Sequence, residues 1–148
     1  MALRSHQMRE TNIAKRQAIA IPAITSARRD YLPCGLIDNH TVVTNKIFAL
    51  YDAELWNMAI VASRLHRTWV ATVCVRLKTD FSYSNTMGWN TYPVPNLTEQ
   101  NKIDLTDCAE AILSAREAHF PASIADLYDP EAMPANLREA HELSLIHI

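Results

Sequence analysis

Glycine is scarce in this chain, with 2 residues in 148, and this scarcity argues against the glycine-rich turns that hold nucleotide phosphates. The three cysteines, Cys34, Cys74 and Cys108, form no Cys-x-x-Cys pair, so neither a zinc site nor a redox motif is expected. No apolar run approaches the roughly 20 residues that span a bilayer. The first residues also lack the apolar core of a signal peptide. We therefore expect a cytoplasmic chain without membrane contact.

Charge is nearly balanced overall, at −2, but it is unevenly distributed. Residues 1–95 contain 11 Lys and Arg against 6 Asp and Glu, whereas residues 96–148 contain 3 against 10. A basic half is suited to approach a phosphate backbone, and an acidic half is not. The alternative, that surface charge simply varies along the chain, stays open from charge alone.

The pattern of apolar residues predicts an α+β protein. Short β-branched runs at 18–21, 35–37, 41–44 and 47–51 are typical of strands. Asp52 is expected to cap a helix that reaches Ser63, with a second helix or a bent continuation over 65–73. Residues 78–90 are expected to form a loop and short strands. Further helices are expected at 98–118 with Thr98 as the cap, after Ser123, and from Pro134.

These patterns divide the chain into four parts. Residues 1–17 are expected to be a connector or a truncated edge, and residues 18–95 a small mixed α/β domain. Residues 96–142 are expected to form an α-helical domain. Residues 143–148 break the helical pattern and match the translation of a common sequencing-library transposon end. We therefore expect those six residues to be a sequencing-adapter artefact.

The run from Arg76 to Ser84 mixes a cation, an anion, hydroxyls and aromatics. If it is extended, Lys78 and Asp80 point to the same face. Lysine can donate to O6 and N7 of guanine, and aspartate can accept from N4 of cytosine, so together they complement one G·C pair in the major groove. The residues alone favour the simpler alternative, a solvated surface ion pair.

Other residues of the basic half are candidates for contacts with a DNA backbone or groove. His66 lies among arginines and is a further candidate for a phosphate. Tyr83 could stack on bases, although core packing is favoured for it and for Trp56 and Trp69. The candidate backbone and groove residues are Arg28, Arg29, Arg64, Arg67, Arg76, Tyr83 and Asn85.

The same run, with Asn90-Thr91-Tyr92-Pro93-Val94-Pro95 after it, resembles the target-recognition segment of the MmeI-like (type IIL) family of DNA methyltransferases and restriction–modification enzymes. That segment reads Arg-Leu-(Lys/Glu)-x-(Asp/Arg)-(Tyr/Phe)-x-Tyr-Ser. Similarity to the family extends over Ser26–Arg29, Tyr31–Leu36 and Ala111–Arg116. Val75 stands where the family usually has a glycine, and Gly88 where an aliphatic residue is usual.

The resemblance implies a target-recognition domain followed by a helical C-terminal domain. It places Lys78 and Asp80 at base-reading positions and Ser82 at a third. Double-stranded DNA is the implied partner. The implied parent enzyme methylates adenine N6 from S-adenosylmethionine and is often fused to an endonuclease.

The chain itself lacks the Asn-Pro-Pro-(Tyr/Phe/Trp) motif that grips a flipped adenine. We therefore expect a fragment without catalytic, cofactor-binding or metal-binding residues, which serves the methyltransferase domain of the same parent chain. One alternative is a helical protein-interaction module with no DNA role, motivated by the acidic amphipathic helix at 98–118. The other, a self-contained enzyme, is disfavoured by the missing motifs.

Overall fold

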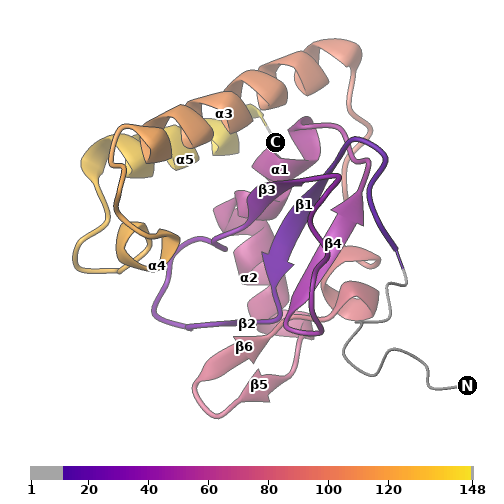
Figure 1. Cartoon of the computed structure of the whole chain (residues 1–148), viewed down its shortest axis with the longest axis vertical. Coiled ribbons are helices and arrows are strands. Elements are labelled where there is room, and N and C mark those ends of the chain that lie inside the picture. Colours follow the sequence, from indigo (N-terminus) through magenta and orange to yellow (C-terminus); the bar gives the residue numbers. More distant parts are fainter. Residues whose placement is uncertain (1–11, 148) are drawn as a thin grey trace, which may run out of the picture.

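The computed structural model describes residues 12–147, which form two small antiparallel sheets and a group of helices (Figure 1). This arrangement confirms the α+β prediction. The strands are β1 (Gln17–Pro22), β2 (Ile24–Thr25), β3 (Gly35–Asp38), β4 (Ile47–Tyr51), β5 (Arg76–Leu77) and β6 (Asp80–Ser82). The helices are α1 (Trp56–Ala62), α2 (Arg64–Val73), α3 (Glu99–Glu117), α4 (Ile124–Leu127) and α5 (Ala135–His147), with a π-helical turn, η1, at Asn85–Trp89.

The first sheet has the order β3-β1-β4, and all of its pairs are antiparallel. In the central strand, Ala18, Ile19 and Ile21 are at most 1% exposed. The strand expected at 41–44 is wrong, because these residues form an irregular loop. Asp38 explains the loop: its carboxylate accepts hydrogen bonds from the His40 N–H and the Thr41 hydroxyl, which turn the chain away from the sheet.

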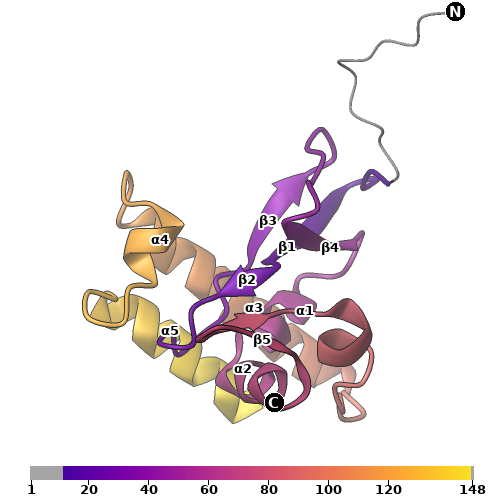
Figure 2. The ribbon, with the colours of Figure 1, turned by 90° about the horizontal axis from the view of Figure 1, so that it is seen from below.

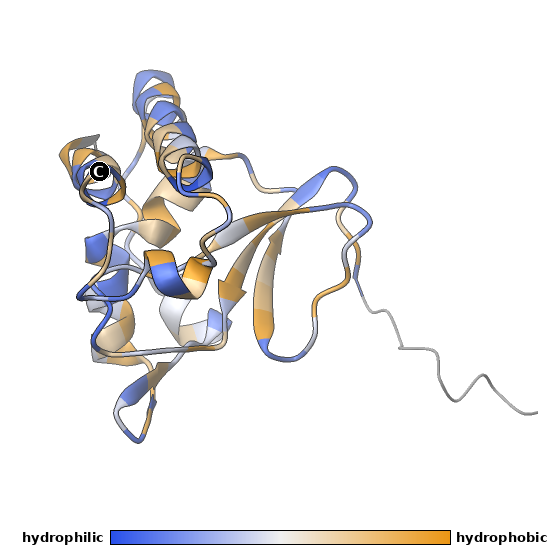
Figure 3. Ribbon diagram, turned by 60° about the vertical axis from the view of Figure 1, so that its left-hand side comes forward, coloured by the Kyte–Doolittle hydropathy of each residue, from blue (hydrophilic) through white to orange (hydrophobic). Residues whose placement is uncertain are grey.

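Helix α1 occupies the centre of the molecule. Its residues Met58–Ala62 have no exposed surface, because the first sheet lies on one side and α3 and α5 lie on the other (Figure 1). A helix that is apolar on all sides is stable only when it is covered in this way. Figure 3 shows that β1 and β4, which belong to the first sheet, are largely hydrophobic. The tip of the β5–β6 hairpin, at the bottom of that view, is hydrophilic.

Asp52 does not cap α1, so that prediction is wrong. Asp52 has a positive φ of 55°, and its carboxylate accepts hydrogen bonds from the Lys15 and Arg16 backbone N–H groups, each at 2.9 Å. Ser63 is the cap instead, but of α2: its backbone is extended and its side chain accepts from the His66 N–H. The chain therefore forms two helices that meet at Ser63.

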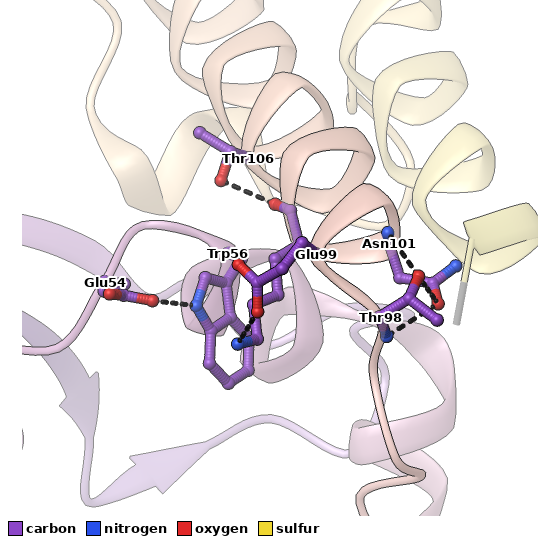
Figure 4. A network of polar contacts seen from close by, with 7 residues as sticks. Glu54, Trp56, Thr98, Glu99, Asn101 and Thr106 are labelled. Atoms are coloured by element: carbon purple, nitrogen blue, oxygen red, sulfur yellow. Dashed lines mark hydrogen bonds and ion pairs between the residues drawn. The ribbon is translucent and has the colours of Figure 1, made fainter.

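Helix α3 begins as predicted, with a capping box between Thr98 and Asn101 (Figure 4). Beside it, the Trp56 indole N–H donates to the Glu54 carboxylate. The predicted boundary after residue 95 falls in the loop between η1 and α3. Residues from both sides of it, including Ile60, Leu105 and Leu137, share one hydrophobic core.

The C-terminal helix extends further than expected. Helix α5 runs to His147, and Ser144 is buried within it. The helical conformation therefore continues past residue 142, and the adapter origin of residues 143–148 stays a prediction. Among the helices of residues 12–147, none is long and apolar enough to cross a membrane.

Candidate nucleic-acid interface

Residues 76–82 of the polar run form a hairpin, which extends below α2 in Figure 1 and is seen from below, with β2 beside it, in Figure 2. Its strands pair Arg76 with Phe81 and Leu77 with Asp80, which leaves Lys78 and Thr79 as the two loop residues. Lys78 has a φ of 58°, as the first loop residue does in the turns that close two-residue hairpins. The premise that Lys78 lies in an extended run is therefore wrong. Its side chain is instead exposed at the tip of the hairpin.

The second sheet, of order β2-β6-β5, has a buried face and an open face. Phe81 and its cross-strand partner Thr25 lie on the buried face, at 1% and 3% exposed. Asp80 and Ser82 flank Phe81 in the strand, so they point the other way and are partly exposed. The open face therefore carries Asp80 and Ser82 together, with Lys78 next to them at the tip.

Two arginines lie over the Phe81 ring, Arg67 of α2 and Arg76 of β5 itself. The guanidinium carbons of Arg67 and Arg76 each lie 5.0 Å from the centre of the Phe81 ring. Arg67 also donates to the backbone carbonyls of Ala27 at 2.6 Å and Arg29 at 3.1 Å. Helix α2 thereby fixes the hairpin to the loop that follows β2. Sequence reasoning missed this role of Phe81, although its position between Asp80 and Ser82 already shows the alternation of a half-buried strand.

The other candidate arginines have partners within the chain. Arg28 pairs with Glu131 at 2.7 Å, but both side chains are largely exposed, so the pair contributes little to stability. Arg64 lies 3.6 Å from Asp30. The Arg29 Nε donates to the Tyr128 carbonyl at 3.2 Å and is partly buried. Arg28, Arg64 and Arg76 thus keep exposed side chains, whereas Arg29 and Arg67 connect parts of the fold.

Tyr83 and His66 lie inside the molecule rather than on the candidate surface. Tyr83 is 3% exposed, His66 has no exposed surface, and the Tyr83 hydroxyl lies 3.1 Å from the His66 Nε2. Burial raises the pKa of Tyr83 and lowers the pKa of His66 to about 4. A groove role for Tyr83 and a phosphate role for His66 are corrected accordingly. Asn85, in contrast, is exposed at the start of η1.

The two departures from the family pattern differ in their surroundings. A Cβ at Gly88 would lie 3.2 Å from the Cys74 sulfur and 3.3 Å from the Tyr83 ring, so these neighbours fill the space of the usual aliphatic side chain. Val75, in place of a glycine, is 75% exposed directly before β5. Trp56 and Trp69, expected in the core, are only partly buried.

Within residues 12–147 there is no group of three or more His, Cys, Asp or Glu side chains placed to hold a metal ion. The three cysteines are buried and unpaired. The candidate surface itself offers hydrogen bonding and charge: an ammonium at the tip, and a carboxylate and a hydroxyl on the open face.

Comparisons with known proteins agree with one another. The family model described as the MmeI target recognition domain matches residues 1–96, and the model of the MmeI C-terminal domain matches residues 97–144. DNA methyltransferase A of Bacillus subtilis (strain 168) is 38% identical over 142 residues, which cover 96% of this chain and 16% of that protein.

Among solved structures, the type IIL restriction–modification enzyme MmeI in complex with DNA superposes with a TM-score of 0.89 at 28% sequence identity. The match covers 93% of this chain and 18% of that one, so the chain spans less than a fifth of the length of either relative. From the family models, the identity and the shared fold together, we conclude that this chain belongs to the MmeI family.

Proposed function

We propose that this chain is the part of a site-specific DNA methyltransferase that recognises the DNA sequence. The observation that carries the proposal is the β5–β6 hairpin, which presents Lys78 at its tip and Asp80 and Ser82 on its open face. The major groove of B-DNA, about 12 Å wide, admits a two-stranded β-ribbon. A hairpin is therefore a suitable element to bring these three side chains to base edges.

The chemistry of the tip suits a G·C pair. The Lys78 ammonium has only donors, and guanine presents the N7 and O6 acceptors in the major groove. The Asp80 carboxylate has only acceptors when ionised, and cytosine presents its N4 amine. The exposed Arg28, Arg64 and Arg76, together with Asn85, are proposed to contact backbone phosphates or groove edges, which position the protein without specifying a sequence.

We further propose that the parent enzyme transfers a methyl group from S-adenosylmethionine to adenine N6. The methyltransferase domain belongs to the same parent chain, and an endonuclease is fused to it in some family members. We expect the catalytic and cofactor-binding residues in that methyltransferase domain and not in this chain. The parent acts on DNA, so it is expected in the cytoplasm.

A charge exchange tests the assignment of the base-reading residues. In the intact parent enzyme, the double variant Lys78→Glu, Asp80→Arg should switch one position of the methylated site from G·C towards C·G, because donor and acceptor change places. One such contact is worth about 1–3 kcal/mol of discrimination. Sequencing that detects N6-methyladenine across a plasmid library would record the preferred site.

The matched control exchanges charges in another exposed pair, as Lys102→Glu with Glu99→Arg. These residues lie at the start of α3, on the opposite side of α1 from the first sheet and away from the hairpin. The control should leave the methylated site unchanged. If the Lys78/Asp80 variant methylates the original site with undiminished preference, those two residues do not read this pair.

A protein-interaction module without a DNA role is the competing function. The family match disfavours it, and salt separates the two. Contacts with phosphates release counterions, so DNA binding should weaken steeply between 50 and 200 mM salt, by about 1,000-fold or more for 6 to 10 contacts. Docking of an apolar partner should change little over the same range. Fluorescence anisotropy with a labelled duplex measures the first quantity directly.

A further inference from the structure

Val75 is an exposed aliphatic residue with a fixed position next to Ser82. The Ser82 N–H donates to the Val75 carbonyl at 2.9 Å, so Val75 lies opposite Ser82, one residue beyond the last pair of β5 and β6. Residues opposite each other in an antiparallel ladder share a face, with Cβ atoms about 4.5–5.5 Å apart. Val75 therefore stands on the open face beside Ser82, and 75% of it is exposed.

The open face has a repeated composition. Leu77, which is 54% exposed, lies opposite Asp80, just as Val75 lies opposite Ser82. Asp80 and Ser82 thus each have an aliphatic neighbour across the hairpin, and Ser82 also has Ile24, 41% exposed, opposite it in β2. Leu77 belongs to the Arg-Leu pair of the family pattern. Val75 thus adds a further exposed aliphatic side chain to this face.

The two polar residues differ in what they can bind. An ionised Asp80 only accepts hydrogen bonds, which suits the cytosine amine and not thymine O4. The Ser82 hydroxyl both donates and accepts, so it suits any of the four bases and leaves the choice of base to its neighbours. Thymine also carries a C5-methyl group at the edge of the major groove, where apolar side chains contact it. A β-branched valine has few rotamers and therefore places its methyl groups firmly.

We propose that Val75 is a further specificity-determining residue, which contacts the C5-methyl group of a thymine in the base pair that Ser82 reads. The proposal rests on the proposed function, since it needs the open face to lie in the major groove. It assigns to this chain a preference for T·A at one position that a glycine at residue 75 does not provide.

Replacement of thymine by deoxyuridine tests the contact, because uracil keeps O4 and loses only the methyl group. The intact parent enzyme is assayed on duplexes of its recognised sequence in which each thymine is replaced in turn. Methylation of one of these duplexes should fall roughly fourfold, the effect of withdrawing one methyl group from an apolar contact. The Val75→Gly enzyme should methylate the thymine and uracil duplexes equally.

Two further variants complete the test. Val75→Thr keeps one methyl group in place and should retain the sensitivity to uracil. Val94→Gly removes another partly exposed valine, 39% exposed in the loop before α3, and should also retain it. Unequal rates on thymine and uracil duplexes that persist in Val75→Gly would overturn the proposal.

The outcomes distinguish this inference from the proposed function. A parent enzyme that methylates one defined site but tolerates uracil at every position, or whose site has no thymine, overturns the role of Val75 alone. A parent enzyme without any sequence preference overturns the proposed function and the Val75 contact with it.

Discussion

Arg67 stabilises the hairpin by three contacts at once. Its guanidinium donates to two backbone carbonyls, those of Ala27 and Arg29, and lies over the Phe81 ring. Its planar group is suited to this combination, which a lysine ammonium cannot reproduce. The same residue was a candidate phosphate contact from sequence, where a basic helix next to a polar run looks alike whether the cations face DNA or the protein.

We expect Arg67→Ala to lower the free energy of unfolding by about 2–3 kcal/mol, because two carbonyls lose a charged donor and Phe81 loses its cation. Arg67→Lys should recover only part of that loss. Arg28→Ala, which removes an exposed ion pair, should change the stability by less than about 1 kcal/mol. Urea unfolding of the chain measures all three. Equal effects of Arg67→Ala and Arg28→Ala would contradict this role.

His66 makes stability depend on pH. Burial lowers its pKa from 6.5 to about 4, so the folded chain keeps it neutral where the unfolded chain already binds a proton. Stability is therefore complete above pH 6.5 and falls as the pH is lowered towards 4, by about 3 kcal/mol from this residue. His141, whose pKa burial and Arg116 lower to about 3, adds a loss of the same sign.

Urea unfolding at several pH values checks this dependence. His66→Gln should reduce the slope between pH 6.5 and 4, because one proton no longer distinguishes the folded from the unfolded state. A flat profile in the unmodified chain would show that neither buried histidine stays neutral.

At the scale of elements, a substitution in the turn of the hairpin should affect stability and DNA recognition in opposite directions. Lys78 adopts a positive φ of 58°, which costs a residue with a side chain about 1 kcal/mol and costs glycine little. Lys78→Gly should therefore keep or raise the thermal stability of the chain while it removes the proposed base contact. Thr79→Gly, at a position without a positive φ, should lower stability. Thermal denaturation of both variants, with site mapping in the parent enzyme, compares the two effects.

The elements that sequence predicts well are those set by local chemistry. Thr98 and Ser123 cap α3 and α4 as expected, since a capping box is a contact within four residues. Asp52 fails as a cap because its partners, the N–H groups of Lys15 and Arg16, are more than 35 residues away in sequence. The spacing of apolar residues also does not distinguish one long helix from two short ones. Here the extended backbone of Ser63 ends α1 and begins α2.

The candidate surface likewise depends on contacts between residues that are distant in sequence, which local patterns do not predict. Motif positions brought Lys78, Asp80 and Ser82 to attention, but their faces depend on a two-residue turn that places Lys78 outside the strand. Tyr83 was a candidate for a base stack, although core packing was favoured for it, and its hydroxyl lies against His66 of α2 inside the core. Packing against α2 determines which aromatic residue is buried. The sequence of the polar run alone does not predict that contact.

At the scale of the whole molecule, a buried polar network joins the segments on either side of residue 96. The Arg116 guanidinium of α3 donates to the Cys34 carbonyl at 2.7 Å and to the Tyr128 hydroxyl. That hydroxyl also lies 2.6 Å from the His141 Nε2, and the His141 ring stacks on Tyr31 at 4.3 Å between centroids. Arg116 is 7% exposed, so these groups have few alternatives in water if a partner is removed.

The recognition segment should therefore depend on the helices that follow it. A chain of residues 1–96 leaves one side of α1 uncovered, where Met58–Ala62 are fully buried in the whole chain. It also leaves the Cys34 carbonyl without Arg116. We expect residues 1–96 to show no cooperative urea transition by circular dichroism, whereas the 148-residue chain unfolds in one step.

Arg116→Leu tests the network without removing the helices. It preserves apolar cover but removes the donor to the Cys34 carbonyl and leaves the Tyr128 hydroxyl with His141 alone, so we expect a loss of about 2–4 kcal/mol with the single transition retained. If residues 1–96 unfold cooperatively and Arg116→Leu costs little, the two segments are independent and the recognition hairpin needs only its own sheet and α2. If both expectations hold, the C-terminal helices are part of the recognition fold. A new specificity built by exchange of residues 1–96 alone then has to preserve the surfaces that meet α3 and α5.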